Sequence, residues 1–183
     1  MKFHKKITSL LLFGVFLCSL IVITTTTVYA AINYELGWGT SGSGEGEFNG
    51  IWGVAIDSAG NIYVSDAQND RIQKFDADGN FILQWGSEGT ANGQFQEPTG
   101  IAVNSFDEVI VADLSNHRVQ IFDTNGNYIR TIGVGLCELN VPGDFCTPWG
   151  VAVDVSDNIY ISVGSGDYSK IHENRVVYHQ LGS

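Results

Sequence analysis

Apolar runs of five or six residues, each followed by a turn sequence, recur along most of the chain. The first four runs cover residues 53–57, 61–66, 71–75 and 81–86. They are rich in β-branched and aromatic residues, and segments 58–61 and 77–80 place Gly or Asn where a tight turn needs a positive φ. The 3.6-residue spacing of an amphipathic helix is absent, so the pattern predicts short β-strands joined by hairpins.

This set of runs returns after 47 residues. Gly53-Val-Ala-Ile-Asp57 returns as Gly100-Ile-Ala-Val-Asn104, and Arg71-Ile-Gln-Lys-Phe75 returns as Arg118-Val-Gln-Ile-Phe122. A third copy starts at Phe145 after three additional residues. Aligning Arg175 with the two earlier arginines places seven more residues between the second and third runs of this copy. Four short strands repeated at this length are typical of one β-propeller blade and predict an all-β fold.

The repeated segments resemble those of the NHL-repeat β-propellers. The resemblance rests on Pro98-Thr-Gly-Ile-Ala-Val-Asn104, Val109-Ile-Val-Ala-Asp113 and Asn116-His-Arg-Val-Gln-Ile-Phe122. The first copy matches these motifs equally well, and the similarity covers nearly all of residues 31–183. The resemblance implies blades of four antiparallel strands. It leaves the function open, because such propellers include binding modules, sensors and several enzymes.

The repeats divide the chain into about three blades, at residues 48–94, 95–144 and 145–183. Residues 34–38 lie 47 positions before the last run of the first blade and are expected to form an additional outermost strand, which the third copy lacks. A propeller closes with roughly four to eight blades. We therefore expect a partial ring, which belongs to a longer six-bladed propeller or closes with a second copy of the chain.

The first 30 residues have the pattern of a signal peptide. A basic start is followed by the apolar residues 7–23 and by small residues at positions 30 and 31. An uncleaved membrane anchor is the alternative, because the apolar run approaches the roughly 20 residues that a spanning helix requires. Both interpretations place the remaining chain outside the cytoplasm, either secreted or at the cell surface.

The charge balance argues against nucleic acid as a partner. The chain has 9 Lys and Arg residues against 20 Asp and Glu residues, and its formal net charge is −11. Three of the lysines lie in the first six residues, and the other basic residues are scattered. Binding to phosphate backbones needs clustered Lys and Arg. We expect contact with a membrane only through the N-terminal segment.

One end of the predicted blades carries the candidate binding residues. The loops before each first strand and those between second and third strands share this end, and both insertions fall there. Variable loops on a rigid scaffold favour a binding site. Two tryptophans at this end, near the mouth of the channel, can stack on sugar rings or anchor a peptide, and packing against the neighbouring blade is the alternative. The candidates are Trp52, Thr99 and Trp149 before the first-strand glycines, and Asp70, His117 and Asn174 before the repeated arginines.

Two further sets of residues are interpreted as structural. Asp66 with Arg71, and Asp113 with Arg118, recur at the same offset and are expected to hold the adjoining loop by charge-assisted hydrogen bonds. Cys137 and Cys146 lie nine positions apart. In an exported chain this spacing favours a disulfide, with a metal site as the alternative.

The sequence identifies no catalytic set, cofactor motif or group of metal ligands. His117 is the one histidine among three equivalent positions, and a single histidine cannot form a usual zinc site. The predicted function is therefore a non-enzymatic, exported scaffold that binds a protein, peptide or glycan through its loop-rich end. The alternative is a metal-dependent lyase or hydrolase of the NHL type, whose channel site is completed by blades that this chain lacks.

Overall fold

A computed structural model describes residues 37–133, 135, 146–164 and, by their backbone, 170–174. The predicted signal peptide, most of the predicted strand over residues 34–38 and Cys137 lie outside the described residues. Among the residues that the structure describes, none belongs to a helix with the length and apolar character needed to cross a bilayer.

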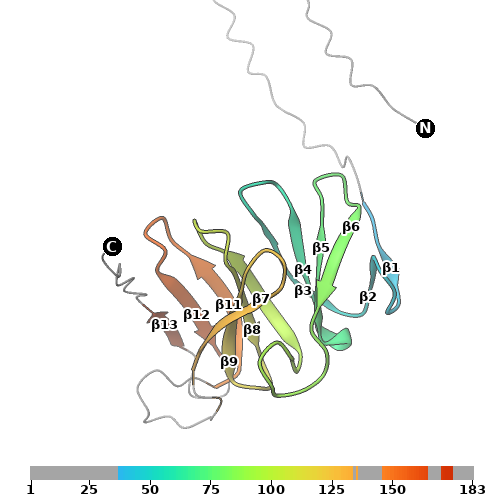
Figure 1. Cartoon of the computed structure of the whole chain (residues 1–183). Coiled ribbons are helices and arrows are strands. Elements are labelled where there is room, and N and C mark those ends of the chain that lie inside the picture. The colour runs from blue at the N-terminus through green and yellow to red at the C-terminus, as the bar shows by residue number, and fades with distance from the viewer. Residues whose placement is uncertain (1–36, 134, 136–145, 165–169, 175–183) are drawn as a thin grey trace, which may run out of the picture. The chain divides into compact units, whose positions relative to one another are not determined.

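Three antiparallel sheets follow one another along the chain, in agreement with the expected blades (Figure 1). Blade 1 consists of β3 (Ile51–Ile56), β4 (Ile62–Asp66), β5 (Arg71–Phe75) and β6 (Phe81–Trp85). Blade 2 consists of β7 (Pro98–Val103), β8 (Val109–Asp113), β9 (Arg118–Phe122) and β10 (Tyr128–Ile132). The described strands of blade 3 are β11 (Pro148–Val153), β12 (Ile159–Val163) and β13 (Lys170–Asn174).

Shorter elements lie at the loop-rich end of blade 1. Strands β1 (Thr40–Ser41) and β2 (Glu47–Phe48) form a small parallel pair before the first blade. A single turn of 3-10 helix, η1 (Ala67–Asn69), connects β4 to β5. The opposite end of the blades consists of tight turns, which we call the turn end. Its turns cover residues 57–61, 76–80, 104–108, 123–127 and 154–158.

The first strands of the three blades lie beside one another, with β7 packed between β3 and β11. Gly100 allows this close approach, because a Cβ there would lie 2.6 Å from the carbonyl oxygen of Trp149. A Cβ on Gly53 would likewise meet the Thr99 carbonyl at 2.7 Å. The repeated first-strand glycines therefore set the spacing between blades, and the residues that precede them are brought close together.

The core lies between the blades. Burying each large apolar side chain in such a core contributes about 1.5–3 kcal/mol. Between blades 1 and 2 the buried residues are Tyr63, Ile72, Phe95, Ile101, Val109, Val111 and Phe122. Between blades 2 and 3 they are Ile110, Ala112, Val119, Ile121, Ile159, Ile161 and Val163.

The third strand of blade 3 differs from the prediction. Aligning Arg175 with Arg118 was wrong, because Lys170 pairs with Val163 as Arg118 pairs with Asp113. Lys170 follows Val163 by seven positions, where Arg118 follows Asp113 by five, so the loop gains two residues and not seven. The backbone register of the antiparallel pair, rather than the identity of a basic residue, fixes where this strand begins.

Candidate binding site at the loop-rich end

The two repeated Asp–Arg pairs hold the loop before the first strand of their own blade. Arg71 Nε donates to Asp66 Oδ2 at 2.8 Å, and Arg118 Nε donates to Asp113 Oδ2 at the same distance. Both pairs are buried. The Arg118 Nη2 donates to the carbonyls of Ala91 and Gln94 at 2.8 and 2.9 Å, so each guanidinium fixes backbone oxygens about 25 residues upstream.

Burial raises the pKa of the Asp113 carboxyl. Opposing this effect, the backbone N–H of Gln96 and the side chains of Arg118 and Asn116 donate hydrogen bonds that favour the carboxylate. The guanidinium of Arg118 is therefore paired with the Asp113 carboxyl group at the base of the site.

Asp70 and His117 lie at equivalent places and connect one blade to the next. Both have left-handed backbone conformations, each with φ of 51°. The Asp70 carboxylate accepts a hydrogen bond from the Glu97 N–H at 2.9 Å, and Nδ1 of His117 accepts one from the Thr147 N–H at 3.2 Å. These two side chains thus join the loop after a second strand to the residue before the next blade's first strand.

Asn174 does not join this group. It is the last residue of β13 and pairs with Ile159, the first residue of β12. Phe75 occupies the same place in blade 1, where it pairs with Ile62. The prediction that Asn174 lies at the loop-rich end is therefore wrong, because it rested on the displaced alignment of Arg175.

Two of the predicted residues form an exposed aromatic pair. The rings of Trp52 and Trp149 lie 5.0 Å apart between centroids and are tilted by 58°. They come from β3 and β11, whose common neighbour is β7. Thr99, at the matching position of β7, is buried and donates from Oγ1 to the Pro148 carbonyl at 3.1 Å. A small residue on the middle strand leaves room for two indole rings from non-adjacent blades to meet.

Both rings remain accessible from outside. Trp52 is 56% exposed and Trp149 is 39% exposed. The pair therefore presents a continuous aromatic surface with two N–H donors, which suits the face of a sugar ring or an apolar side chain.

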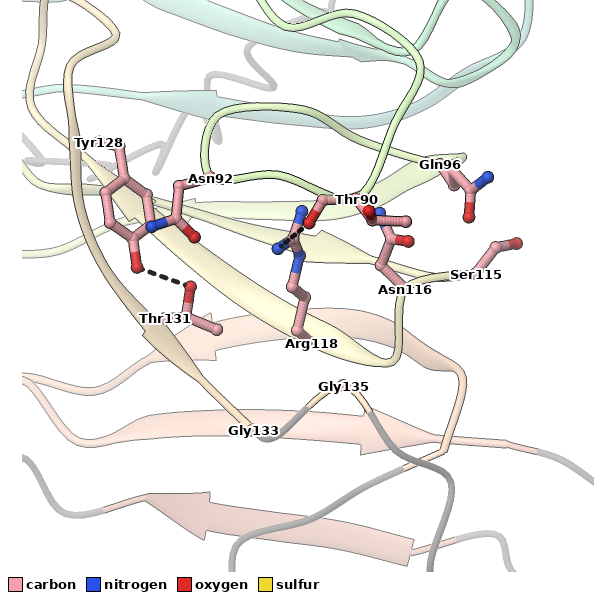
Figure 2. A pocket seen from close by; sticks show the side chains of 10 residues that line it. All are labelled: Thr90, Asn92, Gln96, Ser115, Asn116, Arg118, Tyr128, Thr131, Gly133 and Gly135. Atoms are coloured by element: carbon pink, nitrogen blue, oxygen red, sulfur yellow. Dashed lines mark hydrogen bonds between the residues drawn. The ribbon is translucent and has the colours of Figure 1, made fainter.

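Beside the Asp113–Arg118 pair, the same end contains a polar pocket of about 500 Å³. Figure 2 shows the guanidinium of Arg118 directed into it, with Tyr128 and Thr131 on one side and Gln96 and Ser115 on the other. The Tyr128 hydroxyl and the Thr131 Oγ1 lie 2.9 Å apart. The pocket is lined by Thr90, Asn92, Gln96, Ser115, Asn116, Arg118, Tyr128, Thr131, Gly133 and Gly135.

This pocket is not among the sites predicted from the sequence, although its signal is present in the repeat. In blade 1, Arg71 Nη1 donates to the Ser43 carbonyl at 2.6 Å and to Gln84 Oε1 at 2.8 Å. Thr131 replaces Gln84 in blade 2. Among the described residues, Arg118 Nη1 donates only to the Thr90 carbonyl, at 2.8 Å. The shorter side chain leaves an N–H of Arg118 facing the pocket.

Cys146 is buried and takes part in a disulfide. Its predicted partner, Cys137, lies outside the described residues, so the pairing of these two cysteines stays a prediction. In the described part of the chain, no three His, Cys, Asp or Glu side chains are grouped as metal ligands.

The chain is similar to known NHL-repeat proteins. The NHL repeat model matches residues 48–75 and 95–122. Protein lin-41 of Caenorhabditis elegans is 40% identical over an alignment of 67 residues, and the match covers 32% of this chain and 6% of that protein. The E3 ubiquitin-protein ligase TRIM71 of Rattus norvegicus is 39% identical over 62 residues, 33% of this chain and 7% of that protein. The matches thus cover less than a tenth of either relative.

Among solved structures, the fold is similar to a chain in the crystal structure of a nidogen/laminin complex. The TM-score is 0.51 at 19% sequence identity, and the match covers 66% of this chain and 42% of that chain. This likeness concerns the fold alone.

Proposed function

We propose that this chain, a member of the NHL-repeat β-propellers, is an exported, non-enzymatic binding module. Its ligand would be a protein, peptide or glycan held at the loop-rich end. The observation that carries the proposal is the contact between the exposed rings of Trp52 and Trp149.

The energetics of exposed indole rings favour a binding role. Tryptophan contributes large amounts of binding free energy when a partner buries it, and alanine substitution at such a position commonly costs at least 2 kcal/mol. A pair held by two rigid strands loses little conformational entropy when it binds. The small Thr99 between them supports a binding role, because it allows a shared aromatic surface rather than two separated rings.

Polar groups for orienting a ligand are present at the same end. The pocket beside Arg118 offers hydroxyl and amide groups from residues such as Asn92, Ser115 and Thr131. Ligand sites commonly combine an apolar or aromatic surface with a few polar groups that fix orientation. Export is supported by the sequence pattern of residues 1–30.

The same geometry gives less support to the lyase or hydrolase alternative. Nδ1 of His117 accepts a hydrogen bond from the Thr147 N–H, so the proton of the neutral imidazole lies on Nε2 and neither ring nitrogen offers a free lone pair to a metal. The alternative stays a prediction that depends on residues from other blades.

A binding screen with a matched variant pair tests the proposal. The purified full chain is applied to a glycan array and to a random peptide display library, which serve as the probes. We expect the double variant Trp52→Ala/Trp149→Ala to lose binding to any selected probe by at least tenfold, the equivalent of about 1.4 kcal/mol. Phe106→Ala is the control, since Phe106 is an exposed aromatic residue at the turn end. Equal binding by the double variant and the control would contradict the proposal.

A further inference from the structure

The face of blade 1 that points away from blade 2 is built to receive another blade. Val54 is 58% exposed on this face, whereas Ile101, its equivalent in blade 2, is 6% exposed because blade 1 covers it. We call this side of each blade its leading face, and the side that meets the next blade its trailing face. A cavity of about 200 Å³ lies on the leading face of blade 1, between Trp38, Val54 and Ile62 among others.

The leading faces of blades 1 and 2 have matching side chains. Each has four apolar positions in the same order along the first, second and third strands. In blade 1 they are Val54, Ile62, Val64 and Phe75, and in blade 2 they are Ile101, Val109, Val111 and Phe122. The trailing face that fits blade 2 should therefore also fit blade 1.

Blade 3 carries such a trailing face. The trailing face of blade 1, which packs on blade 2, includes Ala55, Tyr63 and Ser65. Blade 3 repeats all three residue types as Ala152, Tyr160 and Ser162, whereas blade 2 has Ala102, Ile110 and Ala112. These residues of blade 3 border a cavity of about 220 Å³. The two tyrosines also make equivalent hydrogen bonds, each within its own blade. The Tyr63 hydroxyl donates to Asp57 at 2.8 Å, and the Tyr160 hydroxyl donates to Asp154 at 3.0 Å.

A second feature connects the same two faces. At the turn end, neighbouring blades are clamped by a serine of one blade and an aspartate of the next. Ser58 donates from N and Oγ to the Asp107 carboxylate, at 2.9 and 2.7 Å. Ser105 donates in the same way to Asp157, at 2.9 and 2.6 Å.

Both members of this clamp are replaced at the open faces. Val155 takes the place of the serine on blade 3 and is fully exposed, while Gly60 takes the place of the aspartate on blade 1. A blade with the usual aspartate would find no serine on blade 3, and a blade with the usual serine would find no aspartate on blade 1. Loss of both halves is expected if the two faces meet each other, because neither face then leaves a clamp residue without its partner.

Trp38 occupies the position that this contact requires. Its ring lies 6.0 Å from that of Phe75, as the ring of Trp85 lies 5.7 Å from that of Phe122. Trp85 is the last residue of the fourth strand of blade 1, and Trp38 precedes it by 47 residues. Trp38 thus marks where the fourth strand of a preceding blade ends, and blade 3 has three strands in the described residues.

We propose that the trailing face of blade 3 binds the leading face of blade 1 in a second copy of this chain. Two such contacts, related by a twofold axis, close a ring of six blades, which is within the usual range for propellers. The segment that contains Trp38 then adjoins blade 3 of the partner. This assembly does not depend on the proposed ligand at the loop-rich end.

Sedimentation equilibrium of the full chain tests this assembly. We expect a mass of two chains, and we expect Val54→Arg to reduce it to one, because a charged side chain would be buried at the contact. The variant should fold, since Val54 is exposed in the single chain. Ile82→Arg is the control and should stay dimeric, because the equivalent Ile129 is just as exposed in the internal blade 2. A monomeric parent chain, as expected if further blades of a longer protein cover these faces, overturns the proposal. So does a dimer that Val54→Arg leaves intact.

Restoring the clamp tests the register of the contact. Val155→Ser combined with Gly60→Asp should lower the dissociation constant of the dimer about tenfold more than the product of the two single effects, because a hydrogen bond to a carboxylate would form across the junction. Sedimentation equilibrium of the two single variants and the double variant measures these constants. Gly60 has φ of 84°, and Asp107 and Asp157 hold the equivalent positions at positive φ of 59° and 62°, so Gly60→Asp asks for a left-handed conformation of the kind that those two aspartates already adopt. Strictly additive effects of the two substitutions would overturn the proposed register.

Discussion

Blades 1 and 2 hold equivalent arginines by the same contacts, but only the arginine of blade 2 faces a pocket. Arg71 and Arg118 each bind a buried aspartate at 2.8 Å and the backbone of the preceding loop. In blade 1, Gln84 accepts the remaining Nη1 hydrogen bond, and in blade 2 the shorter Thr131 leaves a pocket of about 500 Å³ (Figure 2). One side chain on the fourth strand thus decides whether the arginine is sealed or faces a cavity.

The difference shows how a repeat can acquire a site without changing its scaffold. The residues that hold the guanidinium belong to the second and third strands, which are the best conserved between the two copies. The residue that opens the pocket belongs to the fourth strand, where the copies differ most. Gln84 is exposed, Thr131 is half-buried and neither belongs to the cores between blades, so this position of the fourth strand tolerates such a change.

The largest expected effect comes from removing either arginine. Arg71→Leu and Arg118→Leu should each destabilise the fold by about 3–5 kcal/mol, because a buried aspartate loses its partner and the preceding loop loses its donors. Urea unfolding of the full chain measures both values. Arg118→Lys keeps the charge without the fork of donors and should lie between Arg118→Leu and the parent chain. A loss of unfolding free energy for Arg118→Leu far below that for Arg71→Leu would show that the two arginines are not equivalent in stabilising their blades.

The sequence predicted the blades and the Asp–Arg pairs because the backbone requirements behind them repeat. The first-strand glycines are needed wherever first strands approach closely, and the buried aspartate needs its arginine in each complete copy. Contacts between blades depend on side chains far apart in the sequence. The pairing of Trp52 with Trp149 follows only when Thr99 is known to lie on the strand between them.

Blade 3 was harder to predict for a different reason. Its second strand ends in Val163 instead of an aspartate, so the next basic residue has no charged partner to mark its register. Lys170 and Arg175 are then indistinguishable by pattern, and backbone pairing with Val163 selects Lys170. The wrong alignment of Arg175 had placed Asn174 in the candidate site, and the observed pairing of Asn174 with Ile159 removes it.

A smaller effect is expected from exchanging the residues that close or open the pocket. Thr131→Gln and Thr131→Val both lose the hydroxyl that pairs with Tyr128. Thr131→Gln should be more stable than Thr131→Val by about 1 kcal/mol, because the amide oxygen can accept the free hydrogen bond of Arg118. Gln84→Thr should destabilise the fold by a similar amount relative to the parent chain. Urea unfolding of the three variants measures these differences. If Thr131→Gln is no more stable than Thr131→Val while Gln84→Thr does destabilise the fold, the two arginines do not present the same donor.

The smallest expected effect is a pH-dependent difference in stability between the turn ends of blades 1 and 2. Asp57 of blade 1 and Asn104 of blade 2 are equivalent, and only the aspartate titrates. Burial alone would raise the pKa of Asp57, but hydrogen bonds from Asn61 and Tyr63, with the charge of Lys74, hold it below the usual 3.8. A folded-state pKa below that of the unfolded chain means that Asp57 adds stability above pH 4, and that this stability is lost as the pH falls through the lowered value.

Asp57→Asn should therefore cost no more than about 1 kcal/mol near neutral pH and progressively less below about pH 4, because the protonated carboxyl of the parent chain then resembles the amide. Urea unfolding of both proteins across this range measures the difference. Asp154→Asn is the matched variant in blade 3, where hydrogen bonds from Asn158 lower the pKa of Asp154 to about 2, and its effect should have the same sign. A cost for Asp57→Asn that stays constant with pH would show that the amide disturbs the turn by its shape, and that the charge at this position does not distinguish blade 1 from blade 2.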